Sequence, residues 1–152
     1  MGLFDRLKRL LSSPAPQASD GGDNDGAFDP ERFIYLKVPG NIQPIERGER
    51  FEDPLQAMLE ETGLGGVSGG GSSLSDADAE GRRVVEFCGI DIDVDDRDAA
   101  LQRLRAFLPE LSIPPGSELH YTRDGRLLRD AYADGAWTQA LPREERHPGF
   151  GV

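Results

Sequence analysis

The sequence predicts an α+β domain whose elements follow the order strand, helix, strand, strand, helix, strand. Residues 82–94 alternate between apolar and acidic side chains, which is typical of a strand with one buried face. A glycine-rich segment precedes this strand, and segments with apolar residues at helical spacing flank the pair. We therefore expect residues 82–94 to form the central strand, with the helices packed on its apolar face, which comprises Val84, Cys88, Ile90, Ile92 and Val94.

The composition restricts the function. The chain has 152 residues and a formal net charge of -11. We expect one domain and no nucleic-acid ligand, because binding to phosphates requires clustered Lys and Arg. The acidic charge permits a basic protein partner, or alternatively it serves only to keep the protein soluble. The single cysteine, Cys88, excludes a disulfide within the chain. Together with the lack of a long apolar segment or a signal-peptide pattern, this predicts a cytoplasmic protein.

The N-terminal sequence predicts a short helix that is joined to the domain by a flexible linker. Residues 1–13 carry three basic side chains against one acidic, and an apolar stripe of Leu3, Phe4, Leu7, Leu10 and Leu11. Such a helix suits weak contact with a membrane surface or docking in a partner's groove. Alternatively it packs back onto the domain or frays, because a helix of about three turns is marginal in water. Residues 14–30 are rich in Pro, Gly, Ser and Asp and predict a flexible linker.

The folded domain is expected to span residues 31–141. Its first strand, residues 33–38, is apolar on one face and carries aromatic side chains on the other. A long connection over residues 39–53 follows, and loops of this length are often functional. Asp53 then predicts the start of the first helix, and Gly63 predicts its end in a left-handed conformation.

The glycine-rich residues 67–74 predict an edge strand that forms an antiparallel hairpin with the central strand. Gly69, Gly70 and Gly71 are candidates for close approach by another backbone, since an edge strand of this kind can pair with a second chain. The segment does not match a phosphate-binding loop, because Ser72 stands where Lys is required.

The second half predicts a helix and a hairpin. Asp95 or Asp96 caps the second helix, whose apolar stripe comprises Leu101, Leu104, Phe107, Leu108 and Leu111. The strands expected over residues 117–123 and 126–132 are joined by Asp124-Gly125, a strong two-residue turn signal. A last short strand near Trp137 extends this hairpin, and residues 142–152 predict a polar tail.

This order of elements resembles the ferredoxin-like βαββαβ plait, with both helices on one face of an antiparallel sheet. The resemblance covers about residues 31–123, and the extra C-terminal strand lies beyond it. It concerns the fold alone and implies no particular activity, since this plait carries many unrelated functions.

One candidate binding site joins two sets of residues. Asn41, Arg47 and Arg50 follow the first strand, while Asp91, Asp93 and Asp95 lie at the end of the central strand. If these strands are parallel neighbours, both sets emerge at one end of the sheet. The two arginines then suit a carboxylate or phosphate, or alternatively they pair with their own acidic neighbours. The aspartates do not form an EF-hand loop. That pattern requires Gly and Glu at the positions that Asp96 and Gln102 occupy in this chain.

These observations favour a non-enzymatic protein-binding module without a metal or cofactor. The chain has two histidines, and no catalytic set can be assigned from its sequence. An inhibitor or immunity-type protein would bind a basic partner through the acidic face or the Gly-rich edge, and the same edge would support self-association. Two alternatives remain open at this point: a small-molecule or divalent-metal module, and a membrane-peripheral protein held by residues 1–13.

Overall fold

The computed structural model describes residues 28–144. Its strands are β1 (Phe33–Pro39), β2 (Gly65–Leu74), β3 (Val85–Val94), β4 (Glu118–Arg123), β5 (Arg126–Ala133) and β6 (Ala136–Pro142). They form one six-stranded antiparallel sheet in the order β2-β3-β1-β4-β5-β6, so the domain is α+β as predicted. The predicted helix over residues 1–13 lies outside the described residues, as do most of the linker and most of the tail.

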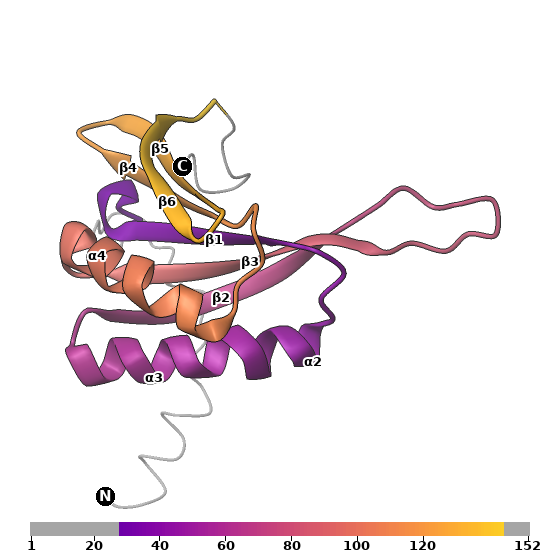
Figure 1. Ribbon diagram of the computed structural model, residues 1–152, viewed down its shortest axis with the longest axis horizontal. Coiled ribbons are helices and arrows are strands. Elements are labelled where there is room, and N and C mark those ends of the chain that lie inside the picture. The colour runs from indigo at the N-terminus through magenta and orange to yellow at the C-terminus, as the bar shows by residue number, and fades with distance from the viewer. Residues whose placement is uncertain (1–27, 145–152) are drawn as a thin grey trace, which may run out of the picture.

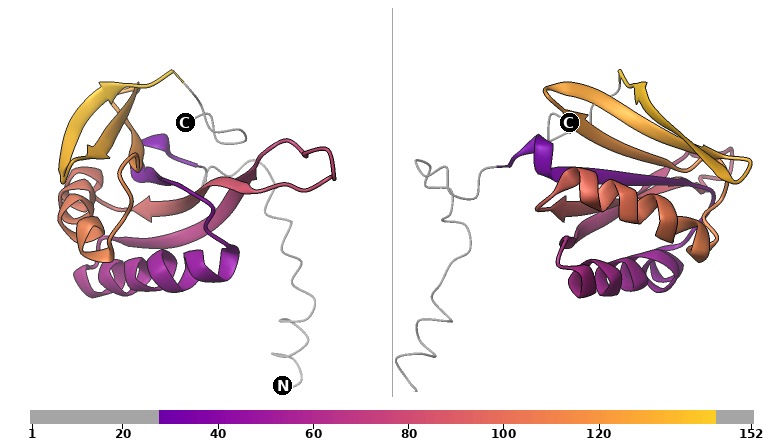
Figure 2. Two further views of the ribbon diagram at one scale, coloured as in Figure 1. Left: turned by 45° about the vertical axis from the view of Figure 1, so that its right-hand side comes forward. Right: turned by 60° about the vertical axis from the view of Figure 1, so that its left-hand side comes forward.

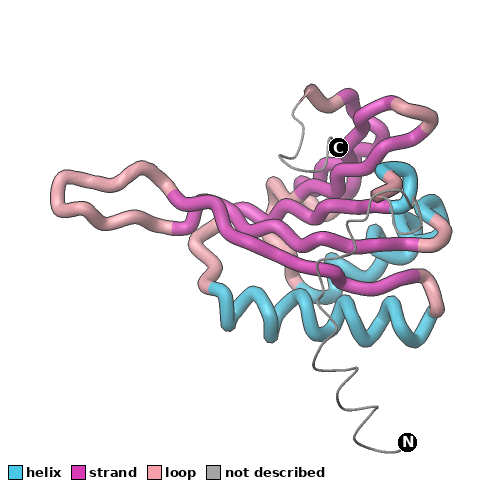
Figure 3. Tube along the Cα trace, turned by 180° about the vertical axis from the view of Figure 1, so that it is seen from behind, coloured by secondary structure: helices cyan, strands magenta, loops and turns pink. Residues whose placement is uncertain are grey.

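The two main helices, α3 (Asp53–Thr62) and α4 (Arg97–Phe107), pack on the same face of the sheet (Figures 1 and 2). Seen from behind, the strands lie in front of α4, and the segment of α2 and α3 runs below β2 (Figure 3). We call the face opposite the helices the open face. The core between sheet and helices is built from apolar side chains that include Ile34, Leu36, Leu55, Leu59, Ile90, Ile92, Leu101 and Leu104.

The alternation predicted for the central strand is confirmed. Cys88, Ile90 and Ile92 are buried against the helices, whereas Asp91 and Asp93 lie on the open face. The prediction is wrong for Val84, which is 54% exposed. β3 begins one residue later, and Val84 belongs to the hairpin arm between β2 and β3 that projects beyond the body of the domain (Figure 3).

The connection predicted over residues 39–53 is mostly helical. α2 (Pro44–Arg47) runs through a π-helical turn, η3 (Gly48–Glu52), directly into α3. Pro44 suits the first helical position, because an N–H group there would have no intrahelical acceptor and proline has no N–H group to leave unpaired. Phe51 is fully buried, so the π turn is fixed by packing in the core. Asp53 has helical backbone angles, so the prediction that it caps a helix start is wrong, but Gly63 ends α3 at φ 69° as predicted.

β2 forms the predicted edge strand and hairpin. It pairs with β3 on one side and stands at the end of the sheet, with a register shift between Val67 and Gly69. α4 begins as predicted, because the Asp96 carboxylate accepts a hydrogen bond of 3.1 Å from the Ala99 amide.

The C-terminal strands extend the sheet beyond β4. Asp124 and Gly125 both have positive φ, 53° and 76°, which confirms the two-residue turn. β6 is a full strand of 7 residues that returns toward α4 (Figure 2), where the Trp137 indole donates to the Arg105 carbonyl at 2.9 Å. Arg143 is buried and donates to the carbonyls of Leu128 and Tyr121, so the packed part of the chain continues past residue 141.

Candidate functional site

The register of β1 and β3 separates the two halves of the predicted composite site. The strands are antiparallel neighbours, with Phe33 opposite Asp93 and Pro39 opposite Phe87. Asn41 therefore follows the end of the sheet where β3 begins, whereas Asp93 lies at the other end. The expectation of parallel strands is wrong, and Asn41, Arg47 and Arg50 do not share a site with Asp93 and Asp95.

Asn41, Arg47 and Arg50 hold the fold together locally. The Asn41 side chain accepts a hydrogen bond of 3.1 Å from the Val85 amide and so ties the end of β1 to the start of β3. The Arg47 guanidinium lies 2.6 Å from Glu52 and donates to Ser72 of β2 at 3.1 Å.

The Arg47–Glu52 pair has the i,i+5 spacing that a π turn brings together. Arg50 pairs with Glu46 at 2.8 Å within the same helical segment. These contacts match the alternative in which the arginines pair with acidic neighbours.

Four aspartates, Asp91, Asp93, Asp96 and Asp98, divide into two groups. Asp96 caps α4, and Asp98 accepts hydrogen bonds from Arg123 and Arg97, which hold the pKa of its carboxyl below the ordinary value. By contrast, none of the ion pairs in the described part of the chain involves Asp91 or Asp93. Burial, and then the charge of Asp93, raise the pKa of Asp91. Asp91 is thus a half-buried carboxylate that takes part in no ion pair within residues 28–144.

Asp91 lies in a groove on the open face. The groove has a volume of about 420 Å³, and its lining comprises Tyr35, Phe87, Asp91, Gly70, Gly71, Ser72 and Ser73. It therefore combines two aromatic walls, one carboxylate and the glycine-rich edge strand. The structure brings together Asp91, Gly70 and Gly71 from the predicted candidates and adds two aromatic side chains to them.

The strand register places three glycines around Asp91 on the open face of the sheet. Gly69 pairs with Asp91, and Gly71 pairs with Gly89, so these positions share the open face. A Cβ at Gly69 would lie 3.1 Å from the Asp91 carboxylate, which therefore extends over β2 toward the edge of the sheet. A Cβ at Gly71 would meet nothing within 4 Å, which leaves a passage from the edge into the groove.

Gly70 faces the helices instead. A Cβ there would meet the Glu52 carboxylate at 2.8 Å, so its lack of a side chain serves the packing of β2 on the Arg47–Glu52 pair. The three candidate glycines thus divide into two on the open face and one against the helices.

Both ends of β2 carry a register shift, between Val67 and Gly69 and between Ser73 and Leu74, and its beginning is also covered by a side chain. The Gln56 side chain of α3 accepts a hydrogen bond of 2.7 Å from the Val67 amide, and the register shift follows directly after Val67. Such side-chain cover and irregularity discourage pairing with another strand. From Gly69 to Leu74, no segment within residues 28–144 pairs with the outer edge.

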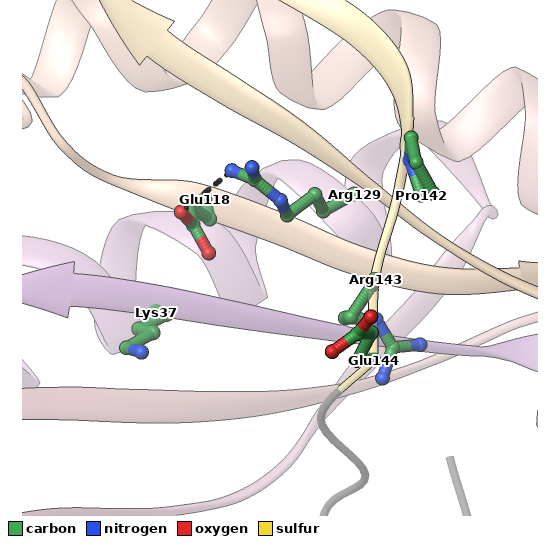
Figure 4. A pocket seen from close by; sticks show the side chains of 6 residues that line it. All are labelled: Lys37, Glu118, Arg129, Pro142, Arg143 and Glu144. Atoms are coloured by element: carbon green, nitrogen blue, oxygen red, sulfur yellow. Dashed lines mark hydrogen bonds and ion pairs between the residues drawn. The ribbon is translucent and has the colours of Figure 1, made fainter.

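The second hollow on the open face is polar. It has a volume of about 410 Å³, and Figure 4 shows its lining residues: Lys37, Glu118, Arg129, Pro142, Arg143 and Glu144. Glu118 pairs with Arg129 at 3.0 Å and lies 2.7 Å from the Nε2 atom of His120, which is fully buried. The lining of this hollow therefore carries charges of both signs, and Glu118 and Arg129 contact each other.

Cys88 is buried as predicted, and burial raises the pKa of its thiol, which disfavours the reactive thiolate.

Comparison of the chain with protein-family models, with curated proteins and with solved structures found no match. None of the helices within residues 28–144 is long and apolar enough to cross a membrane. The same residues hold no group of three or more His, Cys, Asp or Glu side chains placed to share a metal ion.

Proposed function

We propose that this chain is a protein-binding module that receives an extended, basic segment of a partner protein along the outer edge of β2. One observation carries the proposal: β2 is a terminal strand whose edge from Gly69 to Leu74 pairs with no described segment and adjoins the Asp91 carboxylate. Main-chain hydrogen bonds to such an edge supply affinity, and alternate side chains of the added strand supply specificity.

The charge of the chain supports a basic partner. The formal net charge is -11, and Asp91 and Asp93 on the open face form no ion pair within the described residues. A basic segment beside them reduces the repulsion between two neighbouring carboxylates and is drawn in faster by the acidic surface. An inhibitor or immunity-type protein that neutralises a basic partner is one class with these properties.

Exposed apolar side chains at the end of β2 also support an interface here. Leu74 is 53% exposed and Val84 is 54% exposed, and both stand at the base of the projecting hairpin arm. Apolar side chains that remain outside the core beside an unpaired edge are typical of interaction surfaces. They would contact apolar residues of the same bound segment.

The proposed fold family agrees with this placement. The order βαββαβ and the strand order β2-β3-β1-β4 support a ferredoxin-like plait, to which β5 and β6 are added beside β4. In this arrangement β2 keeps its position at one end of the sheet, and the extra strands change only the opposite end.

Selection from a library of random short peptides on the full chain tests the proposal. We expect the side chains of the enriched peptides to alternate with the two-residue period of a strand and to include basic residues. Their binding should weaken as the salt concentration rises. Self-association through the same edge would instead give a dimer in sedimentation without any peptide. Enrichment of peptides without basic residues, or no enrichment at all, would contradict the proposal.

A further inference from the structure

We propose that the groove between Tyr35, Phe87 and Asp91 receives an arginine side chain that the bound partner segment extends across Gly69 and Gly71. This inference rests on the proposed function, since the arginine belongs to the segment that pairs with β2. It adds the residue that the site recognises and the atoms that recognise it.

The carboxylate of Asp91 is placed to take the guanidinium group. It extends over Gly69 toward the sheet edge, and it forms no ion pair within residues 28–144. Two parallel hydrogen bonds from a guanidinium to a carboxylate are stronger and more directional than those of a lysine ammonium. Asp93 lies two residues further along the same face and adds negative charge beside the site.

The aromatic walls suit the rest of the arginine side chain. Tyr35 and Phe87 line the groove, and their rings can contact the methylene groups and the weakly hydrated face of a guanidinium. The Lys37 ammonium lies 4.5 Å from the centroid of the Phe87 ring, so this ring already contacts a cation in the fold. Lysine, with its compact and strongly hydrated ammonium, gains less from the same walls.

The position of β2 gives the side chain a path. A strand added to the edge of β2 lies about 4.8 Å from it, and its side chains on the open face point over the glycine positions. Because Gly69 and Gly71 have no side chains, nothing on β2 blocks an arginine from reaching the Asp91 carboxylate. A side chain at position 71 would close this path, and it would do so without a clash, since its Cβ meets nothing within 4 Å.

A titration of the full chain with N-acetyl-arginine amide, followed by amide and aromatic NMR shifts, tests the groove apart from the strand pairing. We expect saturable shifts at Gly69, Gly71 and Gly89 and in the ring of Tyr35. N-acetyl-citrulline amide, which has the same shape without the charge, should produce none. Equal shifts with citrulline, or arginine shifts confined to residues outside the groove, would overturn the inference.

Three variants sharpen the test. Asp91→Asn should weaken arginine binding about tenfold, because a charge-assisted hydrogen bond is lost. Asp93→Asn is the matched control, which removes the same charge outside the groove lining and should change binding about twofold at most. Gly71→Leu should abolish arginine binding while the chain remains folded. Equal effects of the two aspartate variants would contradict the inference, because they would indicate only general attraction to an acidic surface.

The outcomes separate this inference from the proposed function. Arginine binding without any selected strand-like peptide would support the groove and contradict pairing along β2. Peptide binding that Gly71→Leu and Asp91→Asn leave unchanged would support the edge and overturn the arginine site.

Discussion

The ring of Tyr35 occupies the space that a side chain at Gly89 would need. The two residues lie on neighbouring strands of the open face, and a Cβ at position 89 would overlap the Tyr35 hydroxyl. Gly89 is therefore required so that the Tyr35 ring can lie flat across β3 and form a wall of the groove. The glycines of this sheet thus shape a surface as well as permitting turns.

Gly89→Ala should reduce the free energy of unfolding by about 1–3 kcal/mol, because the Tyr35 ring must leave its place. Urea denaturation measures the change. Gly71→Ala is the control, since its Cβ meets nothing within 4 Å, and it should be neutral or stabilise the strand by up to about 1 kcal/mol. If both variants lose the same stability, the loss does not come from the contact with Tyr35.

A buried network joins β4, β5 and α4. Asp130 is fully buried, accepts a hydrogen bond of 2.7 Å from the Tyr121 hydroxyl, and pairs with Arg105 at 2.7 Å. Asp130→Ala should cost about 3–5 kcal/mol, because it leaves Arg105 without its anion. Tyr121→Phe should cost less, about 1.5–3 kcal/mol, because a single hydrogen bond to a charged acceptor is lost. If the two variants have similar urea midpoints, the network contributes less to the free energy of unfolding than its burial indicates.

The same network predicts a loss of stability at high pH. Burial, and then the hydrogen bond to Asp130 and its charge, raise the pKa of Tyr121 to about 12, against the opposing charges of Arg123 and Arg105. The unfolded chain loses this proton near pH ~10, so the folded chain holds more protons between about pH 10 and 12. The contribution of Tyr121 is thus complete below this range and falls as pH rises, by up to about 1.4 kcal/mol per pH unit.

Chemical denaturation of the native chain and of Tyr121→Phe across this range isolates the contribution. The other groups that titrate there are common to both proteins, so the native chain should lose stability more steeply. Parallel curves would mean that Tyr121 titrates alike in the folded and unfolded chains.

The two arginines of the helical segment should differ in their contribution. Arg47 is 13% exposed and bridges Glu52 and Ser72, whereas Arg50 is 40% exposed and contacts Glu46 on the surface. Arg47→Ala should cost about 1–3 kcal/mol, and Arg50→Ala should stay within about 0.5 kcal/mol in thermal or urea unfolding. Arg50→Ala should also leave the affinity for a selected peptide unchanged, whereas Arg47→Ala removes a contact with Ser72 of the proposed binding edge. Loss of binding in both would restore a role for these residues at an interface.

The sequence predicts elements better than it predicts their neighbours. The alternation from Cys88 to Val94 and the turn at Asp124 and Gly125 are local patterns, and both are confirmed. The helix from Pro44 is missed because Pro44 and Gly48 are typical of a loop. Only the burial of Phe51 in the core explains why this segment is helical, and burial depends on the whole fold.

The groove could be predicted only in parts. The aromatic side chains on the second faces of β1 and β3 are visible as a pattern, and so are the glycines of β2. Their meeting depends on the register that sets Gly71 beside Gly89 and on the antiparallel order of β1 and β3. The residues of one strand do not determine the direction or register in which it pairs with another, because strand pairing is a long-range contact. The predicted cluster of Asn41 with Asp93 failed for the same reason.

Hydrogen exchange of the backbone amides, with and without a selected basic peptide, shows whether a bound segment pairs with β2. We predict that the peptide slows exchange between Gly69 and Leu74, where the outer edge of β2 gains a strand. The edge of β6 at the opposite end of the sheet serves as the internal control and should not change. Protection along β6, or protection confined to the helices while the amides of β2 exchange as before, would contradict the account.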